Sequence, residues 1–99
     1  MPKMSSQITD EKLEKYFLVT GKALKKVKIA KEKEIKWKEM AHDFLDMAQR
    51  YYEDAKYFKQ KGDIVTAFAA LNYAHGWLDA GARLGLFDVD NKENLFTVD

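Results

Sequence analysis

The chain has 99 residues, of which 46% are hydrophobic and 13% aromatic. That is enough apolar material for the core of one small domain, and it argues against a disordered chain. The absence of cysteine excludes disulfides and cysteine-ligated zinc and suits a reducing compartment. The first residues, MPKMSSQITDEK, lack the apolar core of a signal peptide, and no apolar run of 18 residues follows, so we expect a cytoplasmic protein with no membrane partner.

A first helix is predicted over about residues 9–28. Thr9 is a suitable N-cap, and Asp10 and Glu11 would interact favourably with the positive end of the helix dipole. Apolar residues then recur every three or four positions as one stripe, made of Leu13, Tyr16, Phe17, Thr20, Leu24 and Val27. Gly21 lies off this stripe, where a glycine costs roughly 1 kcal/mol relative to alanine unless a neighbour needs the space.

A loop is predicted over about residues 29–36, although no Gly or Pro marks a turn there. Residues 22–38 hold eight lysines against two glutamates, and the rest of the chain is acidic on balance. Lys22, Lys25, Lys26 and Lys28 form a candidate basic patch for RNA or a nucleotide. The alternative is a solvated helix end whose lysines only confer solubility.

A second helix is predicted over about residues 37–61. Its apolar stripe covers a little under half of the circumference and comprises Trp37, Met40, Ala41, Phe44, Met47, Ala48, Tyr51, Ala55 and Phe58, with Leu45 and Tyr52 on the flank. Charged residues occupy the opposite face. This pattern is typical of an amphipathic helix that packs on one side.

The pair Gly62-Asp63 is the clearest helix boundary in the chain, because glycine suits a left-handed C′ position and aspartate suits an N-cap. A third helix is predicted over about residues 64–84, antiparallel to the second because the connection is short. The tail, residues 86–99, has few helix formers. We expect it to be partly ordered, with Leu86 and Phe87 against the end of the bundle and the last residues loose.

The third helix carries far more apolar and small residues than a surface helix requires, over roughly two-thirds of its circumference. Large residues form one ridge (Ile64, Phe68, Leu71, Leu78 and Ala82). Small residues form two others, one of Ala67, Ala70, Ala74 and Gly81 and one of Ala69, Gly76 and Ala80. Small side chains let neighbouring helices approach closely. We therefore expect this helix to be the buried, central element, covered by the first helix, by a second copy of the protein, or by both.

The polar residues of the third helix fall in a narrow arc, with His75 at its inner edge. Asn72, His75, Asp79 and Arg83 form a candidate binding groove, and the i,i+4 pairs His75–Asp79 and Asp79–Arg83 are close enough to interact. One interpretation is a local ion pair and a hydrogen-bonded histidine at the edge of the core. The other is a groove for a ligand or partner, or an enzyme that uses His75 and Asp79.

No motif in the chain supports catalysis, a cofactor or a metal site. Glu39 and His42 have the spacing of di-iron bundles but occur once, on the polar face. His42 and Asp46 lack a third ligand. The pair Gly21-Lys22 lacks the rest of a phosphate loop, and the tail lacks the glycine and ligands of a calcium loop. The only serines are Ser5 and Ser6, near the N-terminus. We predict no catalytic residue, no cofactor and no metal.

The stretch FLDMAQRYYEDAKYFKQKGDIVTAFAALNYAHGWLDAGARLGLF, residues 44–87, resembles an archaeal family known as domain of unknown function 357. The preceding ITDEKLEKYFLVTGKALKKVKI is similar to the family's first helix. The resemblance implies an archaeal, cytoplasmic, all-α protein whose fold is an up-and-down three-helix bundle, and it implies no activity. We expect a non-catalytic protein-interaction or accessory module that associates with a protein partner or with itself, the alternative being RNA or nucleotide binding through residues 22–38.

Overall fold

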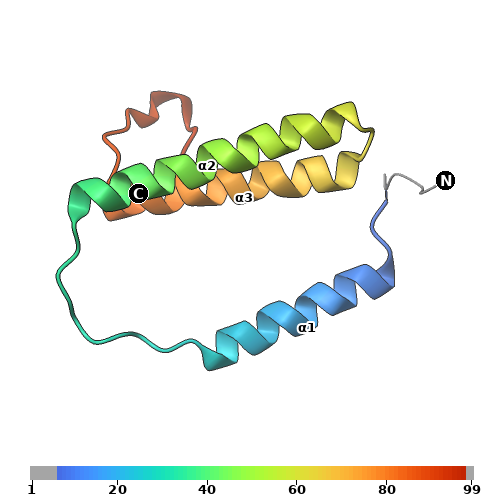
Figure 1. Cartoon of the computed structure of the whole chain (residues 1–99), viewed down its shortest axis with the longest axis horizontal. Helices are drawn as coiled ribbons and strands as arrows, with labels where there is room; N and C mark the ends of the chain where they lie inside the picture. The colour runs from blue at the N-terminus through green and yellow to red at the C-terminus, as the bar shows by residue number, and fades with distance from the viewer. Residues whose placement is uncertain (1–6, 98–99) are drawn as a thin grey trace.

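The computed structural model describes residues 7–97, and the expectations for Ser5, Ser6 and the last two residues of the tail lie outside this range. It contains the helices α1 (Asp10–Lys26), α2 (Trp37–Gln60) and α3 (Ile64–Leu84) and a short 3-10 helix, η1 (Asn91–Glu93), with no strand among the described residues. The all-α fold with three long helices is therefore confirmed (Figure 1).

Local caps fix where the helices begin and end. Thr9 accepts a hydrogen bond from the backbone N–H of Lys12 at 3.1 Å and starts α1. Asp63 accepts one from the N–H of Thr66 at 3.2 Å and starts α3. Gly62 and Gly85 both have φ of 80° and end α2 and α3 in the left-handed conformation that glycine adopts without strain. α1 ends at Lys26, two residues before the predicted end.

α2 and α3 pack side by side in opposite directions, joined by the short turn around Gly62 (Figure 1). Their contact is made of small residues, because the buried core of the described residues consists of Ala48 and Ala55 of α2 and Ala67, Ala70, Ala74 and Gly81 of α3. The predicted ridge of small residues on the third helix is thus the surface that meets the second helix. Small side chains here allow the two backbones to lie close together.

Two aromatic pairs flank this core of small residues. Phe44 of α2 meets Trp77 of α3 edge to face, with ring centroids 4.9 Å apart. Tyr51 and Tyr73 meet in the same way at 4.4 Å. Edge-to-face pairs of this kind stabilise a contact by about 0.5–1.5 kcal/mol beyond the area that they bury.

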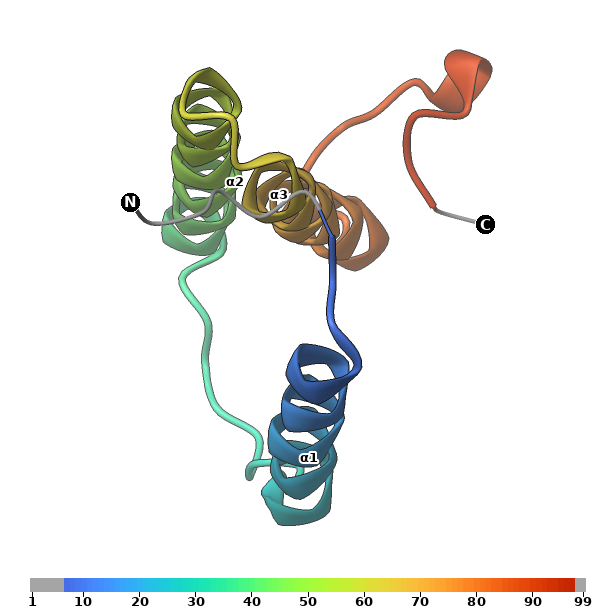
Figure 2. The same ribbon diagram turned by 90° about the vertical axis from the view of Figure 1, so that its right-hand side faces the viewer.

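α1 packs against neither of the other helices. The extended segment 27–36 leads from its end to the start of α2, and a gap separates it from the α2–α3 pair in both views (Figures 1 and 2). The radius of gyration is 16.4 Å, whereas a compact chain of this length has about 12.6 Å. The accessible surface is 9095 Å², against about 5,800 Å² for a compact monomer of this mass.

The expectation that the third helix lies enclosed at the centre of the molecule is wrong for this single chain. Of the long helices only α2 covers α3, so many residues outside the α2 contact remain exposed, including Phe68, Leu71 and Tyr73 at 64%, 43% and 55%. The second ridge of small residues, Ala69, Gly76 and Ala80, is also exposed. The physical reason is that the apolar face of a helix predicts that another element buries it. Whether that face of α3 is buried within one chain depends on the position of α1.

The tail folds back onto α3. The ring of Phe87 packs directly over Gly81, where a Cβ atom would overlap it. Further along, the backbone N–H of Thr97 donates to Asp79 Oδ1 at 2.8 Å, and Phe96 stacks near His75 with centroids 6.4 Å apart. The predicted contact of Phe87 with the bundle end is present. The contacts of Phe96 and Thr97 show that order extends further along the tail than we expected.

Candidate functional site

The four polar residues of the predicted groove on α3 do not converge on one cavity. Asn72 and His75 line a cavity between α2 and α3, whereas Asp79 and Arg83 do not line it. His75 Nε2 lies 3.6 Å from Asp79 Oδ1, the same oxygen that accepts the hydrogen bond from Thr97. Arg83 is exposed and forms no ion pair with any residue of the described range 7–97. The structure therefore joins His75 to Asp79 and leaves Arg83 apart from them.

His75 and Asp79 of this polar strip contact the tail. Asp79 holds the Thr97 amide, and His75 lies between Asp79 and the ring of Phe96. His75 also lines the cavity between α2 and α3, whereas Asp79 does not. The sequence could not indicate the tail contact, because Asp79 and Thr97 are 18 residues apart.

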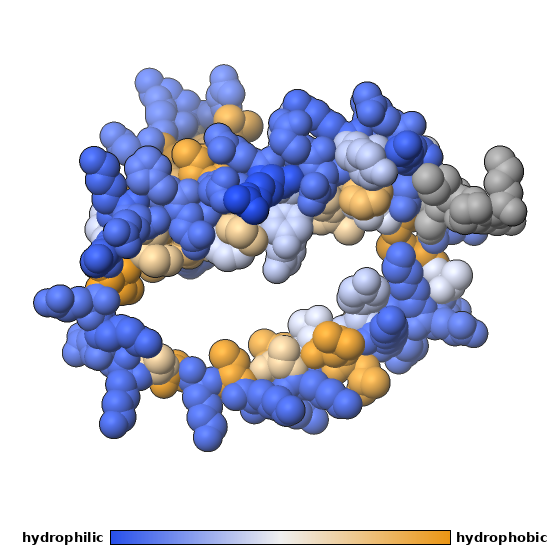
Figure 3. Space-filling model, in the orientation of Figure 1, coloured by the Kyte–Doolittle hydropathy of each residue, from blue (hydrophilic) through white to orange (hydrophobic). Residues whose placement is uncertain are grey.

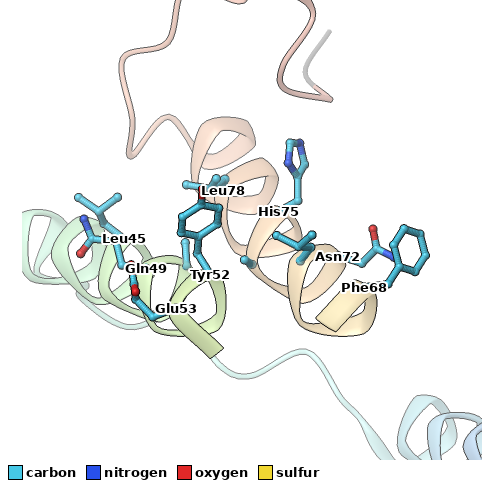
Figure 4. A pocket seen from close by; sticks show the side chains of 11 residues that line it. Leu45, Gln49, Tyr52, Glu53, Phe68, Asn72, His75 and Leu78 are labelled. Atoms are coloured by element: carbon cyan, nitrogen blue, oxygen red, sulfur yellow. The ribbon is translucent and has the colours of Figure 1, made fainter. Parts of the chain in front are cut away.

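The main cavity between the helices is a groove that we call the Leu71 groove, defined by Leu45, Tyr52, Phe68, Leu71 and Leu78. Its volume is about 630 Å³, and a second hollow of about 390 Å³ continues it toward the turn between the helices. Figure 4 shows Tyr52 and Leu78 between the two helices and Glu53 and Gln49 on the rim. The walls are apolar, and five large side chains around the two hollows remain exposed, namely Leu45, Tyr52, Ile64, Phe68 and Leu71.

The Leu71 groove was not identified as a site from the sequence. Its walls were recognised only as the large-residue ridge of the third helix and the flank of the stripe on the second. The sequence signal for this groove is the width of the apolar arc of the third helix, which is wider than one neighbouring helix covers.

A second apolar hollow lies where Phe44 and Trp77 meet. We call it the Tyr73 groove, defined by Phe44, Tyr73, Gly76, Trp77 and Ala80, with a volume of about 330 Å³. Ala69, Tyr73, Gly76 and Ala80 recur every three or four residues, so they form one strip along α3 that leads into this groove. All four residues of the strip are exposed.

Tyr51 packs against Tyr73, which lines the Tyr73 groove. Partial burial raises the pKa of its hydroxyl above the ordinary value of 10.0, and the neighbouring Tyr73 and Asp54 raise that pKa further. The neutral hydroxyl is therefore the form that this contact favours.

The apolar stripe of α1 is the third uncovered surface. Its large residues are between 48% and 71% exposed, namely Leu13, Tyr16, Phe17, Leu24 and Val27. In Figure 3 apolar side chains of α1 face the gap that separates it from the α2–α3 pair. Only the first turns of α1 come near α3, where Leu13 and Tyr16 share a cavity of about 340 Å³ with Val65 and Ala69.

The lysines of the candidate basic patch lie at and just beyond the end of α1. Lys22, Lys25, Lys26 and Lys28 are all exposed, and none pairs with an acidic side chain of the described residues. Lys25 and Lys26 occupy the last turn of α1, where a positive charge interacts favourably with the helix dipole.

Neither a metal cluster nor a membrane span is found in the part of the chain that the structure describes. No group of three or more histidine or acidic side chains there is placed to hold a metal ion. Asp46, which the sequence places beside His42, instead pairs with Arg50 at 2.9 Å. Over the same residues no helix is long and apolar enough to cross a bilayer.

Comparison with known proteins places the chain among proteins without an assigned activity. A family model described as "Protein of unknown function (DUF357)" matches residues 15–87, which include most of α1 and all of α2 and α3. The searches of curated proteins and of solved structures both return no match.

Proposed function

The chain belongs to the DUF357 family of proteins of unknown function, and we propose that it is a non-catalytic helical interaction module for other protein chains. The observation that carries this proposal is the amount of apolar surface left uncovered on α1 and on both sides of the α2–α3 contact. A typical monomer exposes contiguous apolar patches of no more than a few hundred Å².

The Leu71 groove has the form that an amphipathic helix of a partner would fill. It runs between two antiparallel helices, and its apolar floor has charged residues at its rim, Glu53 on one side and Lys56 and Lys59 toward the turn. Helices that bind such grooves place apolar residues at positions i, i+3, i+4 and i+7 along one face. The proposed partner surface is thus an apolar helix face flanked by charged residues.

Site-specific photocrosslinking in the native cell tests this function. The variant Leu71→p-benzoylphenylalanine places the reactive group in the groove, and Arg50→p-benzoylphenylalanine places it on the polar face of α2 as the matched control. We expect a small set of defined protein adducts from position 71 that are absent from position 50 and that Phe68→Glu abolishes. The absence of adducts at position 71, or the same adducts at both positions, would contradict the proposal.

A second candidate function is RNA or nucleotide binding through the lysine patch. The observation that favours it is that Lys22, Lys25, Lys26 and Lys28 are exposed and unpaired with acidic groups of the described chain. Four phosphate contacts to a single strand give a slope of log K against log salt of about −3. We expect the quadruple Lys→Gln variant to abolish retention on short RNA. If the unaltered protein is not retained at about 50 mM salt, where phosphate contacts are strongest, this candidate is excluded.

A further inference from the structure

We propose that two copies of this chain exchange their first helices, so that α1 of each copy packs into the Tyr73 groove of the other. This inference rests on the proposed interaction function and names one partner, a second copy of the chain. It leaves the Leu71 groove, on the other side of the α2–α3 contact, free for another protein.

The two surfaces that would meet are complementary in shape. α1 presents large side chains, including Leu13, Phe17 and Leu24, whereas the strip on α3 consists of small residues around Tyr73. A Cβ added at Gly76 would meet nothing within 4 Å. A glycine inside a helix costs roughly 1 kcal/mol relative to alanine, and close approach of a second helix is the structural reason that offsets this cost.

The uncovered area exceeds what a permanent dimer buries. Each chain exposes about 3,300 Å² more than a compact monomer of its mass, so two chains together expose about 6,600 Å² more, whereas obligate homodimers bury roughly 2,000–5,000 Å² in total over both partners. Docking of one helix per copy thus buries only part of this excess accessible surface. The remainder includes the Leu71 groove.

The linker is long enough for a second copy to supply α1. Residues 27–36 contain no Gly, Pro, Asn, Asp or Ser, the residues that form turns. The ten residues are extended, exposed and free of secondary structure, and such a segment spans up to about 33 Å. A connection of this length lets α1 reach a second copy, and exchange of identical elements between protomers is a low-cost route to dimers.

The orientation of α1 in the groove follows from two observations. The first turns of α1 line one cavity together with Val65 and Ala69 at the start of α3, and α1 and α3 run in the same direction (Figure 1). This places the lysine-rich end of α1 beside the first half of α2, where Glu39 and Asp43 are exposed. Opposite charges then face each other across the contact.

Cysteine cross-linking of the full chain tests the exchange, because the protein has no cysteine of its own. Two tagged chains, one carrying Thr20→Cys and one carrying Ala80→Cys, are mixed in denaturant, refolded together and treated with a short bis-maleimide. We expect a covalent heterodimer on a denaturing gel. The matched control pairs Thr20→Cys with Arg50→Cys, on the polar face of α2, and should give at least tenfold less product.

The double variant Thr20→Cys/Ala80→Cys separates exchange from closure within one chain. Exchange predicts that the double variant gives cross-linked dimers even when the cross-linking reaction is run on diluted protein. An internally linked monomer, or no link at either position, overturns the exchange. Circular dichroism checks that each variant keeps its helices, and Leu24→Cys with Leu84→Cys replaces the pair if one does not. Failure of the exchange leaves the photocrosslinking result at Leu71 unaffected, so the two proposals fail independently.

Discussion

Gly81 is a residue of α3 against which the tail packs directly. A methyl group at this position would overlap the ring of Phe87. We expect Gly81→Ala to lower the free energy of unfolding by about 1 kcal/mol, the low end of overpacking costs, because the ring belongs to a tail that can yield. Urea denaturation measures this change. In a Phe87→Ala background the same substitution should be neutral or stabilising, and an equal loss in both backgrounds would contradict the contact.

Asp63 is the residue that starts α3, through its hydrogen bond from the N–H of Thr66. We expect Asp63→Ala to lower the free energy of unfolding by about 1 kcal/mol, the typical value of an N-cap. Asp63→Asn is the matched control, because asparagine caps about as well as aspartate. The urea midpoint should shift for the alanine variant and not for the asparagine variant, and equal shifts would exclude a capping role.

Tyr51 gives the one pH dependence that the structure supports. Its pKa in the folded chain is raised above 10.0, so the folded state holds the hydroxyl proton to a higher pH than the unfolded state does. This contribution to stability is complete below pH 10 and is lost as the pH rises through the folded pKa. We expect the decline in unfolding free energy above pH 10 to be shallower in Tyr51→Phe. Denaturant titrations at several alkaline pH values measure it, with Tyr16→Phe on α1 as the control, and identical declines would refute the contact.

At the scale of helices, local chemistry fixed most of what could be predicted. The N-caps Thr9 and Asp63 and the glycines at 62 and 85 act through neighbours one to four residues away, so the helix limits could be read from the sequence. Helical periodicity also places the members of each small-residue ridge of α3 on one line, and the structure shows that one of the two predicted ridges is the contact with α2.

The cover of each apolar face could not be predicted in the same way. The apolar stripe of α1 and the wide apolar arc of α3 indicate that another element packs on each of these helices. The periodicity of the residues does not identify that element. The tail contacts lie outside local reasoning too, since Thr97 reaches Asp79 across 18 residues. His75 and Asp79 are candidate site residues because they are polar residues on an apolar helix. In the structure these polar side chains contact the tail.

Gly76 tests the exchange of α1 at this scale. If a second helix packs on the strip, Gly76→Ala introduces a methyl group into a close contact. We expect it to weaken dimerisation at least tenfold, because overpacking costs about 1–3 kcal/mol. Sedimentation over a range of concentrations measures the dissociation constant, and Gln49→Ala on the rim of the Leu71 groove is the control. If the Gly76→Ala protein is more stable than the unaltered protein and dimerises with the same dissociation constant, no second helix packs on the strip of α3.

For the whole molecule, the central observation is that the accessible surface area is larger than that of a compact monomer of the same mass. A chain of 11.5 kDa that exposes 9095 Å² has the apolar residues of a folded domain but covers too few of them with its own helices. The proposed interaction function and the exchange of α1 are two consequences of this imbalance. One assigns the Leu71 groove to another protein, and the other assigns the Tyr73 groove to a second copy.

The molar mass in solution tests the central claim most directly. Light scattering on the unaltered chain, at concentrations from micromolar to near millimolar, measures it without any substitution or label. The account predicts twice the chain mass of 11.5 kDa over most of this range. A mass of one chain at every concentration would contradict it.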